Sequence, residues 1–296
     1  MTGLGRLRAA TARQLTAWLF LAPFLVLFCA MWLVPVARGL LLSATNTDLA
    51  TGAGDLVWLD NYRALATDPV FHDSLGNTLV FVLESVPLLT AVALLLALLA
   101  DVGDGRQILR HAVAAPYFIT GSAVAIIWQF VLEPNTGLLN HGLRALGLPA
   151  QDWLAHPGTA MGAVVLITLW WRVGLPMLIL LAALRGVPRE LREAAHVDGA
   201  NAWQRFRYVI LPQIAPVLLF VVVTRLIESW KVFAQTYLVT GGGPDGSTRV
   251  VLQQLYEVGF QDFRTGYAAA LAWALTLIIL CCTLAQLVLF RRRTDG

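Results

Sequence analysis

The stretch VPRELREAAHVDGANAWQRFRYVILPQIAP, residues 187–216, is a long polar and charge-rich segment between two strongly apolar halves of the chain. Pro188 suits the first position of a helix, and Gly199 is placed to end that helix. A second short helix is predicted from Ala202 to Tyr208, before the next apolar run begins. The segment therefore predicts a short helical hairpin that lies at a membrane surface.

The composition is that of a membrane protein. The chain has 296 residues, of which 58% are hydrophobic and 13% are charged, and its mean hydropathy is +0.69. Soluble domains are about 45–50% apolar and about 25% charged. The net charge of +3 is too small to indicate a nucleic-acid partner. Cys29, Cys281 and Cys282 lie in apolar runs and the histidines lack metal-ligand spacing, so no metal site is predicted.

Apolar runs of about 20 residues are long enough to cross a bilayer as helices. Six such runs predict an all-α polytopic membrane protein in which residues 1–296 form one membrane domain. The first run is expected to be a retained span, because it is too long for the apolar region of a signal peptide. The predicted spans are 18–42, 75–100, 112–132, 160–184, 214–239 and 267–290.

The arginines indicate which way the spans run. Positively charged residues gather on the cytoplasmic side of membrane proteins. Both termini and the polar segment are therefore predicted to be cytoplasmic. The side with more arginines carries Arg6, Arg8, Arg13, Arg106, Arg110, Arg185, Arg189, Arg192, Arg205, Arg207, Arg291, Arg292 and Arg293, and the other side or its span ends carry Arg38, Arg63, Arg144, Arg249 and Arg264.

A signature lies within the polar segment. The triplet EAA, residues 193–195, is followed by Gly199 and then by Leu211 and Pro212. This order and spacing resemble the EAA signature of the permease subunits of bacterial ABC importers, with Val209 where that family usually has isoleucine. A motif of this kind carries weight when its context is also present.

Two further stretches extend the resemblance, which covers nearly the whole chain. VDGA (197–200) and TGGGP (240–244) resemble the carbohydrate-importing branch of the maltose and glycerol-phosphate type. The glycines of the second stretch are also expected to form a tight turn on the outer side.

The resemblance implies that residues 185–213 form a loop that couples the membrane helices to separate ATPase subunits. A permease does not hydrolyse ATP itself, and a short helix seated in a groove of a partner transmits rigid-body motion. ATP and magnesium are accordingly expected on the partner ATPase subunits, with no cofactor in this chain. The implied coupling residues are Glu193, Ala194, Ala195, Asp198, Gly199, Leu211 and Pro212.

Charged residues inside spans usually face a cavity or a partner. Those in the predicted spans are Glu84, Arg172, Arg225, Glu228 and Lys231. Arg225, Glu228 and Ser229 are spaced to share one helix face, and fixed polar groups beside aromatic faces suit a sugar. The resemblance to maltose-type permeases adds Trp170, Gly174 and Met177 as solute contacts. Two other interpretations stay open. Arg225 and Glu228 could form a buried pair that locks two helices or the two permeases together, and Trp170, Trp171 and Met177 could be ordinary packing residues.

The leading hypothesis is one permease subunit of an ABC importer that carries a sugar or related polyol, such as a disaccharide or glycerol phosphate, by alternating access. The implied partners are a second homologous permease, two ATPase subunits, an extracytoplasmic solute-binding protein and the bilayer of the bacterial cytoplasmic membrane. No catalytic residues are predicted. One alternative is a transporter driven by an ion gradient, with Glu84 and Glu228 as proton carriers. Another is a membrane-embedded transferase, against which the chain shows no nucleophile with a base beside it.

Overall fold

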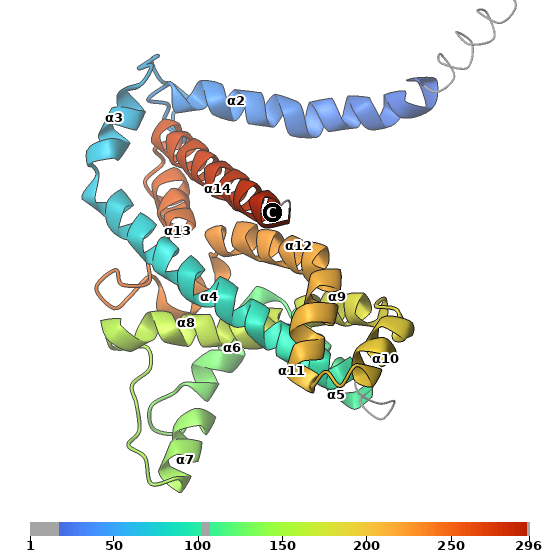
Figure 1. The fold of residues 1–296 in the computed structure, drawn as a ribbon. Coiled ribbons are helices and arrows are strands. Elements are labelled where there is room, and N and C mark those ends of the chain that lie inside the picture. Colours follow the sequence, from blue (N-terminus) through green and yellow to red (C-terminus); the bar gives the residue numbers. More distant parts are fainter. Residues whose placement is uncertain (1–17, 102–106, 295–296) are drawn as a thin grey trace, which may run out of the picture. The chain divides into compact units, whose positions relative to one another are not determined.

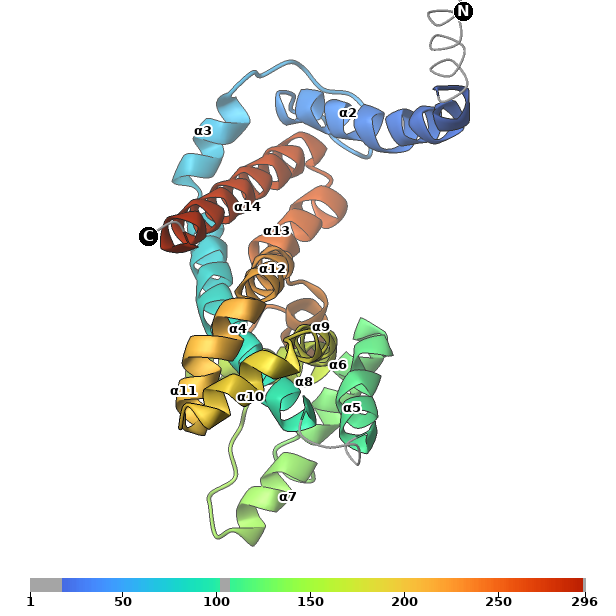
Figure 2. The same ribbon diagram turned by 45° about the vertical axis from the view of Figure 1, so that its right-hand side comes forward.

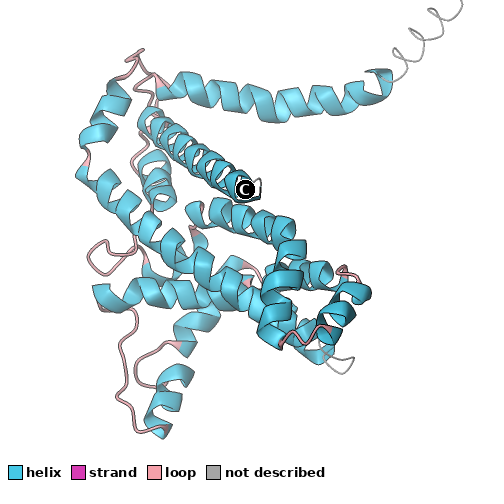
Figure 3. Ribbon diagram, in the orientation of Figure 1, coloured by secondary structure: helices cyan, strands magenta, loops and turns pink. Residues whose placement is uncertain are grey.

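The computed structural model describes residues 18–101 and 107–294, and the secondary structure within these ranges is helical (Figure 1). Figure 3 shows helices joined by turns and loops, and one isolated antiparallel bridge joins Thr45 to Leu56. The all-α prediction is therefore confirmed. Arg6, Arg8, Arg13 and Arg106, which contribute to the predicted orientation, lie outside the described residues.

The described helices fit a polytopic membrane protein. Two helix pairs are bent at a short break, Gln107–Phe118 with Gly121–Val131 by 109° and Pro157–Arg172 with Gly174–Arg185 by 50°, and each pair passes the length and composition test together. They bring the number of candidate spans in the described ranges to six if each pair is one span. The four unbroken candidate spans are Trp18–Ser43, Pro69–Asp101, Ala202–Trp230 and Thr265–Phe290.

Contacts within the chain group its residues into two compact units, each of which is described here by itself. One comprises the residues up to Thr67 together with Glu257–Trp273, and the other comprises Asp68–Tyr256 together with the residues from Ala274 onward. The expectation of one membrane domain stays a prediction.

The first unit contains the helical run Trp18–Ser43, which includes the π-helical turn η1 (Cys29–Leu33) and α2 (Val34–Ser43). It also contains α3 (Asp60–Thr67), the π-helical turn η6 (Glu257–Gln261) and the beginning of α14 (Thr265–Thr294). The Gly266 N–H donates to the Thr47 carbonyl at 3.1 Å. A Cβ at position 266 would lie only 1.9 Å from the Thr45 carbonyl oxygen, so this contact between the loop and α14 requires glycine.

The second unit holds the remaining helices, shown from two directions in Figure 1 and Figure 2. In chain order they are α4 (Pro69–Asp101), α5 (Gln107–Ala114), the 3-10 turn η3 (Ala115–Phe118), α6 (Gly121–Val131), α7 (Leu138–Ala145), α8 (Pro157–Arg172), α9 (Gly174–Arg185), α10 (Arg189–Val197), α11 (Ala202–Gln204), the π-helical turn η4 (Arg205–Ile210), α12 (Leu211–Trp230), the π-helical turn η5 (Thr236–Thr240), α13 (Val251–Tyr256) and the rest of α14.

The core of the second unit lies where α4, α9 and α12 meet. Ala93, Ala97 and Ala100 recur every three or four residues on one face of α4, and all three are completely buried. Small side chains let helix backbones approach closely in membranes, where dispersion contacts hold helices together. The three alanines of α4 pack with Met177, Leu180, Leu181 and Leu184 of α9 and with Ile214 and Val221 of α12.

The predicted third and fourth spans, 112–132 and 160–184, are each broken by a bend. Pro176 has no N–H to donate to the Arg172 carbonyl four residues earlier, so the helix bends between α8 and α9. Gly174 lies at this bend, and a Cβ there would be 2.5 Å from the Val113 carbonyl oxygen. The bend therefore lets α9 pack directly against the backbone of α5.

The predicted fifth span, 214–239, also differs from the structure. Its helix begins earlier, because α11, η4 and α12 form one continuous helical run from Ala202 to Trp230. The chain then leaves the helix at residues 231–233 before η5 begins. Non-helical backbone at membrane depth is tolerated where it lines a cavity, because lipid offers no hydrogen-bond partners.

We predict that Ala97→Phe destabilises the protein. The added ring has no space between α4 and α9, and overpacking a close-packed core costs about 1–3 kcal/mol. Thermal unfolding of the detergent-purified protein, followed by size-exclusion chromatography, measures the effect. Leu95→Ala is the control, since Leu95 lies on the same helix and is 56% exposed. Equal melting of the Ala97→Phe protein and the parent would contradict this account of the core.

Candidate functional site

The helical hairpin expected in the polar segment is present in part. α10 begins after Pro188 and ends at Val197, and Gly199 follows it with φ of +79°, in the left-handed region. The Ala200 N–H then donates to the Ala195 carbonyl at 3.0 Å, which closes the helix end. The second arm differs from the prediction, because it continues directly into α12 and is not a separate helix ending at Tyr208.

A capping box starts that second arm. The Asn201 side chain accepts a hydrogen bond from the Gln204 N–H at 2.9 Å, and the Gln204 side chain accepts one from the Asn201 N–H at 2.9 Å. Both bonds satisfy N–H groups that have no partner inside the helix. The short sequence between Gly199 and Ala202 is thus enough to end one helix and begin the next.

The predicted coupling residues lie at or near the surface of this hairpin. Large apolar side chains beside them are also exposed, including Val197 at 85%, Trp203 at 67% and Tyr208 at 74%. A hollow of about 360 Å³ lies between the end of α10 and η4. Glu193, Ala194, Asp198, Gly199 and Pro212 are exposed, and Ala195 and Leu211 are half-buried. We call the exposed residues 191–208 the coupling surface.

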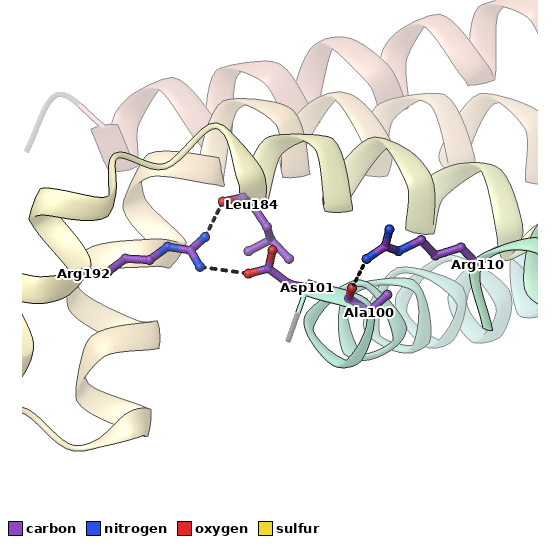
Figure 4. A network of polar contacts seen from close by, with 5 residues as sticks. All are labelled: Ala100, Asp101, Arg110, Leu184 and Arg192. Carbon is purple, nitrogen blue, oxygen red and sulfur yellow. Dashed lines mark hydrogen bonds and ion pairs between the residues drawn. The ribbon is translucent and has the colours of Figure 1, made fainter. Parts of the chain in front are cut away.

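A polar network links α10 to the ends of α4 and α9 (Figure 4). Arg192 forms an ion pair with Asp101, with 2.8 Å between Nη1 and Oδ2, and its Nη2 donates to the Leu184 carbonyl. Beside it, Arg110 Nη2 donates to the Ala100 carbonyl at 2.8 Å. Two arginines therefore satisfy carbonyl groups in the last turns of two helices, where a positive charge is favourable.

A cavity of about 450 Å³ lies deeper in the second unit. It is lined by α4, by the end of α8, by the end of α12 and by residues 231–235, which follow α12. Its charged and polar lining consists of Thr168, Arg172, Arg225, Glu228, Ser229, Lys231 and Gln235, and its apolar lining consists of Phe81, Leu89, Trp171, Val232, Phe233 and Ala234. This mixture of aromatic faces and fixed polar groups suits a hydroxylated ligand.

Most polar groups of the cavity are held in place by neighbours. Arg225 Nη2 lies 2.6 Å from Glu228 Oε1, and the exposed fractions of the two side chains are 6% and 44%. Ser229 Oγ lies 3.2 Å from Ser85 Oγ, which joins α12 to α4. Gln235 Nε2 donates to Thr168 Oγ1 at 3.3 Å. These contacts fix side-chain orientation before any ligand arrives.

Arg172 is positioned differently, because aromatic rings hold its guanidinium group. The group lies 3.7 Å from the centroid of the Trp171 ring and 5.4 Å from that of Tyr117. Trp171 is itself fixed by its indole N–H, which donates to the Ile119 carbonyl at 3.0 Å. Stacking of this kind leaves the N–H groups at the edge of the guanidinium free to bind an acceptor.

The structure brings Arg225, Glu228 and Ser229 together in the cavity, as their helical spacing predicts. Trp170, Gly174 and Met177 do not line it. Trp170 packs edge-to-face on Trp128 with 5.8 Å between ring centroids, Gly174 contacts the backbone of α5, and Met177 is completely buried in the core of α4, α9 and α12.

Sequence reasoning did not assign Thr168, Trp171, Arg172 and Lys231 to the site. Trp171 and Arg172 follow Thr168 by three and four residues, so each lies beside Thr168 on the surface of α8. That spacing, together with a charge inside a span, was a usable signal. No group of three or more histidine, cysteine, aspartate or glutamate side chains that fits a metal ion occurs among the described residues.

Comparison with known proteins identifies the family. The protein-family model described as binding-protein-dependent transport system inner membrane component matches residues 69–295 of this chain. The chain belongs to this family. It is a multi-pass membrane protein and a permease subunit of an ABC importer, a component of a transporter and not an enzyme.

Individual relatives cover nearly the whole permease. The probable ABC transporter permease protein YesP of Bacillus subtilis is 34% identical over 98% of this chain and 96% of that protein. The arabinooligosaccharides transport system permease protein AraP of the same organism is 31% identical over 94% of this chain and 89% of that protein. A bacterial ABC transporter involved in the import of the acidic polysaccharide alginate shares the fold, with a TM-score of 0.83 at 24% identity over 97% of this chain and 99% of that one.

We predict that Gly199→Ala loosens the C-terminal end of α10. The permease has open space at this position, so the cost comes from the left-handed backbone alone and is about 1 kcal/mol. Amide hydrogen exchange across residues 189–200 is expected to be about fivefold faster at the helix end. Gly158→Ala is the control, because that position is also open but lies in the first turn of α8 without a positive φ. Unchanged exchange in the Gly199→Ala protein would contradict the proposed cap.

Proposed function

We propose that this permease subunit imports a sugar or related polyol that carries an acidic group, and that the solute passes through the cavity at the ends of α8 and α12. The class of solute is supported by AraP, whose name specifies arabinooligosaccharides. The acidic group is supported by the charges of the cavity itself.

The observation that carries the proposal is the excess of positive charge in the cavity lining. Arg172, Arg225 and Lys231 face a single acidic residue, Glu228. Because Glu228 pairs with Arg225, the charges of Arg172 and Lys231 remain uncompensated among the lining residues. Uncompensated charge at membrane depth is costly and favours a ligand of opposite sign. Guanidinium groups also match the geometry of carboxylate, sulfonate and phosphate groups.

The rest of the lining suits the hydroxylated part of such a solute. Phe233, which is half-buried in the lining, offers an apolar ring to the carbon side of a sugar. Ser229, Thr168 and Gln235 offer hydroxyl and amide groups to its oxygens. The combination favours a sugar acid or a charged polyol over a simple inorganic anion, which would make no use of the aromatic faces.

Coupling to ATP hydrolysis is proposed through the coupling surface. Its exposed apolar side chains, such as Val197 and Trp203, and the neighbouring Glu193 fit a helix that seats in a groove of another protein. We propose two ATPase subunits as that partner, which bind ATP and magnesium, together with a second permease and an extracytoplasmic solute-binding protein. The distribution of arginines supports a cytoplasmic position for the coupling surface and both termini of the chain in the bacterial cytoplasmic membrane.

The ion-gradient hypothesis receives less support. It requires two membrane acids in one pathway. Glu84 is exposed on α4 and is not among the cavity-lining residues, whereas Glu228 is paired with Arg225. Glu228 is therefore engaged in an ion pair within α12, and it does not form a pathway of acids with Glu84.

Uptake into proteoliposomes tests the energy source. The complete transporter, supplied with its binding protein and loaded with ATP inside, is expected to accumulate solute in the presence of a protonophore. Accumulation is expected to stop when the internal ATP is replaced by a non-hydrolysable analogue. The reverse pattern would contradict coupling to an ATPase. The solute is identified by mass spectrometry of the ligand that co-purifies with the binding protein, and a neutral sugar there would contradict the acidic group.

A charge substitution tests the cavity. We predict that Arg172→Gln lowers uptake of the acidic solute about tenfold or more, because a charged hydrogen bond contributes about 1.5–3 kcal/mol. Arg172 is chosen because it forms no ion pair with another side chain among the residues that the structure describes, so its loss leaves no described acid without its partner. Arg63→Gln, which removes a 79% exposed guanidinium group outside the cavity, is the control. Equal uptake by the two variants would contradict a role for Arg172 in binding.

A further inference from the structure

α10, the first arm of the coupling surface, has few contacts with α4 and α9, whereas the second arm continues directly into α12. None of the residues of α10 is buried, so the helix has no apolar anchor of its own in the core. His196 contacts Arg205 at 3.0 Å, but this contact stays inside the hairpin. Arg192 is different, because its side chain reaches the ends of two membrane helices (Figure 4).

The two acceptors of Arg192 come from segments far apart in the chain. Asp101 is the last described residue of α4, and Leu184 is in the last turn of α9. The planar guanidinium group donates to both at once, through Nη1 to the carboxylate and through Nη2 to the carbonyl. Two hydrogen bonds from one planar group fix the orientation of the Arg192 guanidinium as well as its distance from the two acceptors.

The helices that Arg192 joins lead directly to the cavity. α4 contributes Phe81 and Leu89 to the lining and holds Ser229 through Ser85. α9 follows α8, whose last turn carries Arg172. Since α4 and α9 pack through completely buried residues at this end, they move as one body under a force applied to it.

We propose that Arg192 is a positioning residue that locks α10 to α4 and α9, so that displacement of α10 is passed to the helices that line the cavity. This inference rests on the proposed function, in which a conformational change of an ATPase subunit displaces α10. The side chains of Arg192 and Asp101 are 31% and 15% exposed, and the core beside them is apolar and complete without them. Loss of Arg192 is therefore expected to leave the fold intact and to interrupt transmission.

A reporter cysteine in the lining measures how accessible the cavity is to a reagent in water. Ala234→Cys is introduced at the lining after Cys29, Cys281 and Cys282 are replaced by alanine, and the permease is assembled with its partner subunits in nanodiscs. The rate of modification by a membrane-impermeant maleimide is measured without nucleotide and after trapping with ATP and vanadate. In the parent we expect the rate to change at least fivefold on trapping.

Arg192→Ala is expected to keep the ATPase rate within twofold of the parent and to reduce the change in labelling to less than twofold. Arg189→Ala is the matched control, because it removes the same charge from the same helix at an exposed position. The exchanged pair Arg192→Asp with Asp101→Arg restores the ion pair and is expected to recover more than half of the response. A purely structural role would instead lower assembly and ATPase activity together.

The outcomes separate this inference from the proposed function. Absence of a nucleotide response in the parent overturns the proposed coupling itself. A parental response in the Arg192→Ala protein overturns the role of Arg192. If the Arg192→Ala protein does not assemble, the Asp101→Asn variant is tested in its place, because it removes the ion pair and leaves the hydrogen bond to the Leu184 carbonyl. A reduced labelling response in that variant supports the inference, and a parental response overturns it.

Discussion

The close packing of α4 against α9 is the interaction on which the arrangement of the larger unit depends. Ala93, Ala97 and Ala100 permit it, because each places only a methyl group between the two backbones. In lipid, apolar side chains gain little by leaving the solvent, so helix association relies on dispersion contacts at short distance. The paired ends of these helices in turn provide the two acceptors that receive Arg192, and their other portions lead to the cavity.

The cavity exists because two predicted spans are not straight helices. α8 ends where Pro176 removes a hydrogen bond, and the chain leaves α12 after Trp230. Each interruption lies within a predicted span and beside polar side chains of the cavity lining. These groups are tolerated because they face a protein-lined space and not lipid. The positively charged lining and the breaks in the helices therefore occur together, because both require surroundings other than lipid.

Much of the fold was readable from the sequence, because a bilayer imposes length and apolarity on each span. The ends of α10 were also readable, since Pro188 and Gly199 have strong backbone preferences. The breaks in the spans were not predicted. Pro176 is a local signal for the bend between α8 and α9, but the close approach of α9 to α5 at that bend follows from tertiary packing. Gly174 illustrates this, because the resemblance implied a solute contact there, whereas its lack of a side chain serves contact with the backbone of α5.

The site was predicted in part for a similar reason. Helical spacing correctly grouped Arg225, Glu228 and Ser229, but it does not say which face of α8 is turned toward them. One residue along a helix changes direction by about 100°, which separates Trp170 from Trp171. The contact between Arg192 and Asp101 spans 91 residues of sequence, and no local pattern predicts it.

The cap at Gly199 and the capping box at Asn201 have a further thermodynamic meaning. A nine-residue helix such as α10 is too short to be stable by itself in water. With both turns closed by hydrogen bonds inside the chain, its backbone is ordered before a partner arrives. A protein that binds this surface then loses less conformational entropy on association, and more of the contact energy remains available as affinity.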